Sequence, residues 1–287
     1  MRALITGGNG FIGSRLAQTL TQKGWEVDVM DLPLDITQKG AWMLKLNNID
    51  YVFHLAAKLD DYSETPSISE YIDTNVKSIG LLFEVITEKK LYIKKIVFAS
   101  SQSVYGDSTF FMNEKDVLAP LSMYGATKAT AETLLFALGV MYNIRTVALR
   151  YSIVLGAGQK YKDADSRILP CFVDMAQKGE IITHENGLQT RDFIHVKDAV
   201  DVTIFAAKNL TGIFNVGSGD TTSVMEVAKY IGAHFEAEIQ TSGKSRINTA
   251  RNQVMNINKI KQAGWSPRLT WRDAVDEFIA SLPPPVA

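Results

Sequence analysis

Cysteine, long apolar runs and an excess of charge of either sign are all scarce in this sequence of 287 residues. The single cysteine, Cys171, cannot form an internal disulfide, and its apolar neighbours in ILPCFVDMA predict a buried structural thiol. No apolar run approaches the ~20 residues that a membrane-spanning helix needs. With 30 basic and 31 acidic residues the net charge is -1, so the basic excess typical of nucleic-acid or membrane-surface binding is missing. We therefore expect a cytoplasmic protein that binds neither.

Signal-peptide features, internal repeats and low-complexity stretches are also missing, and RALITGG at the start is typical of a strand entering a loop. Short apolar or β-branched runs alternate with longer helical patterns through the first half. This alternation predicts an α/β fold, a Rossmann-type doubly wound parallel sheet with helices on both faces. After residue 150 the alternation fades, so we expect a smaller α/β lobe there. The expected strands are Ala3–Thr6, Glu26–Met30, Tyr51–His54, Ile96–Ala99 and Thr146–Leu149, and the expected helices are Phe11–Lys23, Ile68–Lys89 and Tyr124–Tyr142.

A glycine-rich turn lies between the first expected strand and the first expected helix, in ALITGGNGFIGSRL. Gly7, Gly10 and Gly13 let backbone N–H groups approach a pyrophosphate, to which the helix N-terminus adds partial positive charge. Asp31 ends the second strand about twenty residues further on, where a carboxylate accepts hydrogen bonds from ribose hydroxyls. No arginine stands beside Asp31 to receive a 2′-phosphate. The pattern predicts a dinucleotide site and favours NAD over NADP.

Hydroxyl groups gather where the fourth expected strand ends, in FASSQSVYGD, and a tyrosine and a lysine follow downstream. Tyr124 and Lys128 are four residues apart on an expected helix and therefore share one face. A nearby ammonium lowers the pKa of a phenol, whose ordinary value of about 10 makes it a poor base at neutral pH. A serine at the strand end then holds a substrate hydroxyl. An amphipathic surface helix is the alternative interpretation of the Tyr–Lys pair taken alone.

Seven segments, in order, resemble landmarks of the extended short-chain dehydrogenase/reductases, in the NAD-dependent epimerase/dehydratase group acting on nucleotide sugars: TGGNGFIG, FHLAA, SSQSVYG, YGATK, LRYSIVLGAGQ, QTRDFIHVKDAV and GIFNVGSG. The resemblance covers nearly the whole chain and implies roles for individual residues. The implied catalytic residues are Ser101, Tyr124 and Lys128, of which Tyr124 and Lys128 also contact the cofactor. The further implied NAD contacts are Gly7, Asn9, Gly10, Phe11, Ile12, Gly13, Asp31, Asp35, Ile36, Leu55, Ala56, Ala57 and Asn75. The implied substrate contacts are Ser101, Gln102, Tyr124, Arg191 as a diphosphate clamp and Arg251 as a second one; no metal site is implied.

Three positions depart from the family pattern. The connection DLPLDITQKG is short, as in nucleotide-sugar reductases of this type. Ile153 stands where family epimerases commonly have an asparagine that contacts the substrate diphosphate, so this contact could pass to Ser152 or to the backbone. Gln102 and Ser103 follow Ser101 where 4,6-dehydratases carry an acid pair, and neither is an acid at neutral pH. The third departure disfavours dehydration.

The leading functional hypothesis is NAD-dependent epimerisation of a nucleotide sugar at C4. The alternatives are a 4-keto-sugar reductase that uses NAD(P)H and a non-catalytic NAD-binding sensor. The resemblance implies a homodimer formed by Ile68–Lys89 and Tyr124–Tyr142 of each subunit. We expect a dinucleotide-binding domain over residues 1–150 with returning segments near 192–217, and a substrate lobe over 151–191 and 218–287. The sugar and its nucleotide stay open.

Overall fold

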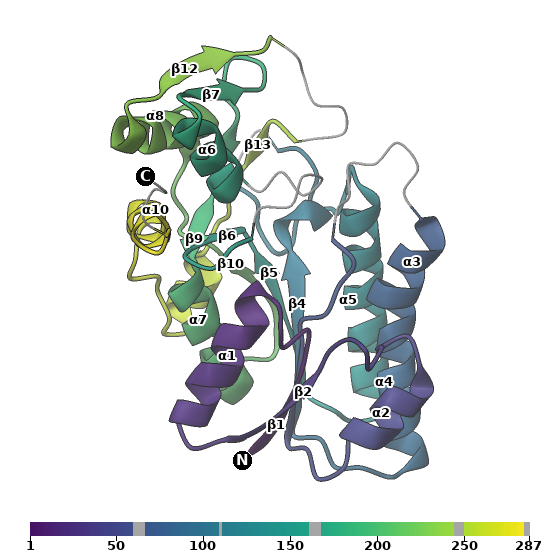
Figure 1. Ribbon diagram of the computed structural model, residues 1–287. Coiled ribbons are helices and arrows are strands. Elements are labelled where there is room, and N and C mark those ends of the chain that lie inside the picture. The colour runs from purple at the N-terminus through teal and green to yellow at the C-terminus, as the bar shows by residue number, and fades with distance from the viewer. Residues whose placement is uncertain (60–66, 109–110, 161–167, 244–249, 284–287) are drawn as a thin grey trace.

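A six-stranded parallel sheet forms the centre of the computed structural model, which describes residues 1–59, 67–108, 111–160, 168–243 and 250–283 (Figure 1). The strand order is β2-β1-β3-β4-β5-β10, read from one edge to the other. This order reverses direction at β1, and ligands of doubly wound sheets bind where the order reverses, beyond the carboxyl ends of the strands. The strands are β1 (Arg2–Thr6), β2 (Glu26–Met30), β3 (Tyr51–His54), β4 (Lys95–Ser101), β5 (Thr146–Tyr151) and β10 (Gly212–Val216).

Helices cover both faces of this sheet, as the sequence predicts (Figure 1). Side chains alternate along a strand, so Ala3 and Ile5 of β1 enter one apolar core while Leu4 enters the other. The first core lies under α1 (Phe11–Gln22) and α7 (Val196–Asn209). The second core lies under α2 (Lys39–Lys45), α4 (Ser78–Glu88) and α5 (Met123–Met141).

The expected strands and helices of the first half are found within a few residues of their predicted bounds. The expected helix Ile68–Lys89 consists of α3 (Ile68–Ile72), a π-helical segment η1 (Asp73–Lys77) and α4, in direct succession. Helix α2 was not predicted. The irregular turn of η1 gives Asn75 a buried position between two regular helical segments.

A third, smaller core belongs to the lobe above the carboxyl ends of the strands (Figure 1). It is built by α6 (Ile168–Gln177), α8 (Val224–Phe235), α10 (Trp271–Ala280) and the strand pair β7 (Glu180–Thr183) and β12 (Glu238–Thr241). Short strands connect this lobe to the sheet: β6 (Ile153–Leu155) with β9 (Phe193–His195), and β8 (Thr190–Arg191) between β11 (Thr222–Ser223) and β13 (Asn252–Gln253).

The C-terminal part of the chain contributes to the first core and to the core of the lobe. Helix α9 (Asn258–Gln262) and Trp265 pack against the first core, whereas α10 packs in the lobe. The returning segment 192–217 supplies β9, α7 and β10. The proposed division into two domains stays a prediction. Within the described ranges, no helix is both long and apolar enough to cross a membrane.

Candidate active site

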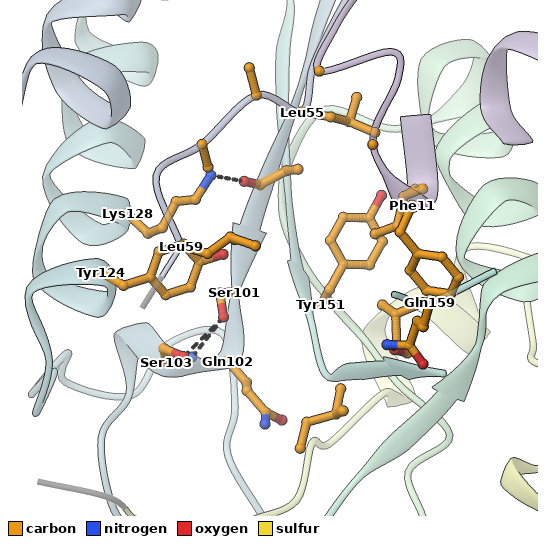
Figure 2. A pocket seen from close by; sticks show the side chains of 18 of the residues that line it. Phe11, Leu55, Leu59, Ser101, Gln102, Ser103, Tyr124, Lys128, Tyr151 and Gln159 are labelled. Carbon is orange, nitrogen blue, oxygen red and sulfur yellow. Dashed lines mark hydrogen bonds between the residues drawn. The ribbon is translucent and has the colours of Figure 1, made fainter. Parts of the chain in front are cut away.

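A cavity of about 1240 Å³ opens between the carboxyl ends of the sheet strands and the second lobe. Its volume exceeds that of a typical pocket for one small ligand, so it has room for a dinucleotide and a second molecule. Side chains from α1, β4, α5 and β5 converge on it (Figure 2). Of the predicted site residues, those lining it are Gly7, Asn9, Gly10, Phe11, Ile12, Gly13, Asp31, Asp35, Ile36, Leu55, Ala56, Ala57, Ser101, Gln102, Tyr124, Lys128, Arg191 and Arg251.

The glycine turn after β1 forms one end of the cavity. Gly7 has φ +68°, and a Cβ atom there would lie 2.8 Å from the Ala56 backbone nitrogen, so only glycine fits without strain. A Cβ atom on Gly13 would overlap the Gly7 carbonyl oxygen. Gly10 is the N-cap of α1, and no side chain caps this helix. The N–H groups of the first turn therefore suit a pyrophosphate.

Asp31 lies at the end of β2, beside this turn. Its Oδ2 accepts a hydrogen bond from the Asn9 N–H at 2.9 Å, and its Oδ1 accepts one from the Leu32 N–H at 2.9 Å. These bonds hold the carboxylate at the rim of the cavity, where a ribose hydroxyl can add to them. Asp35 and Ile36 line the same end, next to Asp31.

Ser101, Tyr124 and Lys128, the predicted catalytic residues, line the other end of the cavity together (Figure 2). Ser101 ends β4, and its Oγ donates to the Ser103 Oγ at 3.1 Å while accepting from the Ser103 N–H. The Lys128 Nζ lies 5.7 Å from the centre of the Tyr124 ring and donates to the Ala99 carbonyl at 2.7 Å. A hydroxyl, a phenol and an amine thus face one space, as proton transfer to or from a bound hydroxyl requires.

The charge of Lys128 is set by its surroundings. Burial lowers the pKa of Lys128 from its ordinary 10.5 to about 7, and the Glu132 carboxylate one turn along α5 opposes this shift. Glu132 is itself buried and receives hydrogen bonds from Arg150 of β5, at 2.9 Å from Nε and 2.6 Å from Nη2. Arg150 also donates to the Tyr105 hydroxyl at 2.8 Å. This network was not predicted from the sequence, although Glu132 stands one turn after Lys128.

A second buried network lies beneath the cofactor end and was also missed. Ser78 donates its hydroxyl hydrogen to the Thr74 carbonyl at 2.6 Å, so His54 Nε2, 3.2 Å from the Ser78 Oγ, is the donor of that pair. In a neutral ring Nδ1 then accepts from the Thr6 Oγ1 at 2.8 Å, and Thr6 Oγ1 itself accepts from the Ala56 N–H at 3.1 Å. Burial lowers the pKa of His54 to about 3. A neutral imidazole with its proton on Nε2 therefore supports the loop of Leu55 to Ala57.

Asn75 does not line the cavity, unlike the other predicted cofactor contacts. It is buried, and its amide bonds to the backbone of Lys58, at 2.8 Å from the Lys58 N–H and 3.0 Å to the Lys58 carbonyl. It also donates to the Thr127 Oγ1 at 2.9 Å. Asn75 therefore connects α5 to the chain after β3 rather than facing a ligand.

Arg191 on β8 and Arg251, directly before β13, both line the cavity. The Arg191 Nη1 donates to the carbonyls of Thr190 and Arg251 at 2.8 Å each, and its Nη2 donates to the Ala250 carbonyl at 2.6 Å. The guanidinium thus fixes the segment that carries Arg251. Arg251 is exposed, and its backbone N–H donates to Asp107. Both residues line the same cavity, and their role as a diphosphate clamp stays a prediction.

Cys171 departs from the sequence-based prediction of a buried thiol, because it is only partly buried. The reason is its place on α6, whose other face packs in the lobe core through Leu169, Phe172 and Val173 while Cys171 lines the cavity. Ile153 and Ser152, at the departure from the family pattern, line the cavity too.

The fold and the cavity together define a doubly wound, dinucleotide-binding protein with a phenol and an amine at its reactive end. The model of the NAD-dependent epimerase/dehydratase family matches residues 3–217, and the chain belongs to this family. It is 30% identical to a UDP-N-acetyl-α-D-glucosaminuronate decarboxylase of Bacillus cytotoxicus, over 97% of this chain and 96% of that protein. It is 28% identical to a putative UDP-glucose 4-epimerase of Methanocaldococcus jannaschii, with 96% of each chain covered.

Solved structures resemble the whole chain as well. MoeE5 in complex with UDP-glucose and NAD is 29% identical, with a TM-score of 0.88 and 98% of each chain covered. The UDP-glucose 4-epimerase of Thermus thermophilus, solved with NAD, has a TM-score of 0.89 at 24% identity and 98% coverage of each chain, a likeness of fold. The family's cofactor is NAD, and the glycine cradle and the Asp31 carboxylate of this chain fit its pyrophosphate and ribose.

Proposed function

We propose that this protein is an NAD-dependent nucleotide-sugar epimerase that inverts C4 through a transient 4-keto sugar. The observation that carries the proposal is the convergence of Ser101, Tyr124 and Lys128 on the cavity that also contains the glycine turn. Relatives of similar length act on nucleotide sugars, with a dTDP-L-rhamnose 4-epimerase of Burkholderia thailandensis and the putative UDP-glucose 4-epimerase among them. Bound NAD would accept the hydrogen of C4 as hydride and return it to the opposite face of the sugar.

The side chains of this chain would manage the proton. Tyr124 as a phenolate takes the proton of the 4-hydroxyl, and it returns that proton when the hydroxyl forms again. The Ser101 hydroxyl holds the reacting oxygen in place. In its ammonium form, Lys128 stabilises the phenolate, and its Nζ lies near enough to the Tyr124 ring for this electrostatic effect. The cycle has no net oxidation, so the cofactor stays bound between turnovers.

The residues after Ser101 support epimerisation over dehydration. Gln102 and Ser103 form the short helix η2 (Gln102–Val104), and neither side chain is an acid that could protonate a leaving hydroxyl. Reduction of a 4-keto sugar would use the same Ser, Tyr and Lys. A dTDP-4-dehydro-6-deoxyglucose reductase of Escherichia coli, 26% identical over 97% of this chain, keeps this second candidate open.

Replacement of Tyr124 by phenylalanine tests the proposal. A panel of UDP- and dTDP-hexoses is incubated with the NAD-loaded protein, and the products are separated by chromatography. We expect Tyr124→Phe to lower turnover by about 10²- to 10⁴-fold while NAD binding is kept, because only the proton-transferring oxygen is lost. The exposed Tyr92→Phe is the matched control and should retain full activity.

Two other results would count against epimerisation. Turnover by Tyr124→Phe at the wild-type rate would remove the phenol from the mechanism. Loss of NADH absorbance in proportion to added 4-keto sugar, without interconversion of hexoses, would identify the reductase instead.

We also propose that the protein is a homodimer formed through the outer face of α3, α4 and α5. Ile72, Val140 and Met141 are exposed apolar residues of this region, with 47%, 85% and 69% of their surface accessible. Apolar exposure of this kind is typical of interfaces. A single monomeric species in sedimentation velocity would contradict the dimer. The cytoplasmic location stays a prediction.

A further inference from the structure

The amine of Lys128 has few partners for a buried cation. Its residue is 1% exposed, and among the described residues the Ala99 carbonyl is the single acceptor of a hydrogen bond from Nζ, at 2.7 Å (Figure 2). An ammonium carries three donors, and a buried charge is stable only where its surroundings replace the water that it has lost. Other groups near Nζ therefore decide whether Lys128 carries the proton.

The face of an aromatic ring lies next to this amine. Lys128 Nζ is 4.6 Å from the centre of the Phe98 ring, closer than the 5.7 Å that separate it from the centre of the Tyr124 ring. The face of such a ring is electronegative and attracts a cation within about 6 Å, most strongly where water is excluded. Phe98 is also 1% exposed, so solvent does not weaken this contact.

The sheet fixes the position of this ring. Phe98 is a residue of β4 and belongs to the core that α5 covers, one residue before Ala99. His54 of β3 lies beside it in the strand register, and the two rings stack with their centres 5.9 Å apart and their planes at 27°. Because burial lowers the pKa of His54 to about 3, the imidazole is neutral and adds no positive charge near Lys128. The ring and the carbonyl that contact the amine thus come from adjacent residues of one strand.

The charged groups on the elements around Lys128 are mostly paired elsewhere. Tyr124 and Glu132 lie one turn away on either side along α5, and Arg150 of β5 bonds to Glu132. Strand β4 carries Lys95 at its opposite end, and η2 contains no charged residue. The ion pairs of α3, η1 and α4 are Glu70 with Lys58, Asp73 with Lys77, and Glu84 and Glu88 with Lys39. Glu132 therefore supplies the nearby carboxylate, and the Phe98 ring supplies an attraction without net charge.

We propose that Phe98 is a positioning residue, whose ring face holds the Lys128 amine in its ammonium form beside Tyr124. The use of this charge rests on the proposed function, in which the ammonium stabilises the Tyr124 phenolate. A second carboxylate in the place of the ring would also hold the ammonium, but it would repel the phenolate. An aromatic face avoids this conflict, because it attracts a cation and carries no net charge.

The test compares two replacements of Phe98. Phe98→Leu keeps an apolar side chain and removes the ring. Phe98→pentafluorophenylalanine keeps a ring of similar shape, but its fluorines withdraw electrons and reverse the charge distribution of the face, so it fills the core where leucine leaves a cavity. Phe83→Leu is the matched control, because Phe83 is 1% exposed in the same core and its ring contacts Tyr142 rather than a cation.

NMR measures the charge of Lys128 directly, in NAD-loaded protein with ¹³Cε-labelled lysine, and Lys128→Met identifies the signal. We expect the midpoint of the Lys128 titration to fall by about one pH unit in both Phe98 variants, because the ammonium loses its ring partner. The midpoint in Phe83→Leu should equal that of the wild type. Thermal melting verifies that each variant is folded.

The pH dependence of turnover gives a second readout. Burial lowers the pKa of Lys128 to about 7 in the wild type, so a further fall of one unit leaves about tenfold fewer ammonium groups at pH 8 and about twofold fewer at pH 6. Turnover by the Phe98 variants should therefore be about tenfold below the wild type at pH 8 and within about twofold of it at pH 6. A defect in packing alone would not recover as the pH falls.

The outcomes separate this inference from the proposed function. Equal midpoints in the wild type and in both Phe98 variants would overturn the inference while the epimerase stands. A midpoint that falls with leucine but not with pentafluorophenylalanine, or that falls equally in Phe83→Leu, would assign the effect to packing and overturn it as well. If the wild-type protein turns over no nucleotide sugar, the proposed function fails, and the NMR midpoints still decide whether Phe98 holds the charge of Lys128.

Discussion

Buried polar groups on two sides of the cavity differ in whether the chain itself supplies their hydrogen-bond partners. We call Thr6, His54, Ser78, Glu132 and Arg150 the floor, since they lie beneath the loops and helix that carry the cofactor and catalytic residues. Each of them is bonded within the chain. We call Ser100, Gln102 and Ser152 the wall, where β4 and β5 end. Their Ser100 Oγ, Gln102 Oε1 and Ser152 Oγ are buried and unpaired among the described residues.

The proposed function gives the two ligands different residence times, since the cofactor stays bound while the substrate exchanges in each cycle. A cofactor that stays bound needs a rigid cradle, and closed hydrogen-bond networks give rigidity because any displacement breaks several bonds. A substrate that exchanges in each cycle has to find partners that the chain has not already used. Changes in the floor should therefore act on stability, whereas changes in the wall should act on substrate binding.

The largest expected effect is on the floor, at the buried Glu132–Arg150 pair. Glu132→Gln would leave the Arg150 guanidinium buried without its counter-charge, which typically costs about 3–5 kcal/mol. The two side chains are 3% and 2% exposed, so solvent offers little screening. The free energy of unfolding in urea measures the loss. Glu84→Gln, at an exposed carboxylate of α4, is the control and should cost well under about 1 kcal/mol. A loss as small as that of the control would mean that the hydrogen-bond network of the floor does not stabilise the fold.

A pH-dependent effect is expected at His54. Its pKa is about 3 in the folded protein and 6.5 in the unfolded chain, so below pH 6.5 the unfolded chain binds a proton that the folded protein does not. Stability that is complete above pH 6.5 is therefore lost as the pH falls toward 3, by about 1.4 kcal/mol per unit. His54→Gln keeps a donor and an acceptor but does not titrate.

The measurement compares urea unfolding of wild type and His54→Gln at pH 7 and pH 4.5. The wild type should lose about 3 kcal/mol more than the variant between these values, since other carboxylates titrate alike in both. A constant difference between the two proteins would show that His54 is protonated in the folded state, and the assigned direction of its hydrogen bonds would be incorrect.

The main sheet and its helices could be predicted because their signals are local. The runs around Ile96 and Val147 are apolar and β-branched over several residues, and helix α5 is long and rich in apolar residues. Helix α2 was missed because KGAWMLK is short and contains glycine. Tertiary contacts stabilise this helix, because Trp42 is fully buried and its Nε1 donates to the Ile36 carbonyl at 2.8 Å.

The residues of the candidate site also fall into those with local sequence signals and those whose partners lie far away in the sequence. The glycine turn and the Tyr124–Lys128 pair are spaced within single elements, so their arrangement follows from helix and turn geometry. The partners of the buried networks lie 18 residues apart for Arg150 and Glu132, 48 for Thr6 and His54, and 151 for Gln102 and Gln253. Only the folded chain brings them together. Asn75 is different, since the family resemblance implies a cofactor contact there, but in the structure its amide bonds to Lys58 and Thr127.

The smallest expected effect uses Cys171 as a reporter on the substrate side. It is the single cysteine of the sequence, it is partly buried on α6, and it lines the cavity. A nucleotide sugar at ten times its dissociation constant leaves about one site in eleven empty, so alkylation by iodoacetamide should slow by about tenfold. NAD alone should slow it little, because α6 belongs to the lobe opposite the glycine turn. Intact-mass spectrometry follows the reaction, and Cys171→Ser should take up no label. Full protection by NAD without sugar would place the thiol on the cofactor side. The cavity would then not have separate cofactor and substrate sides at α6.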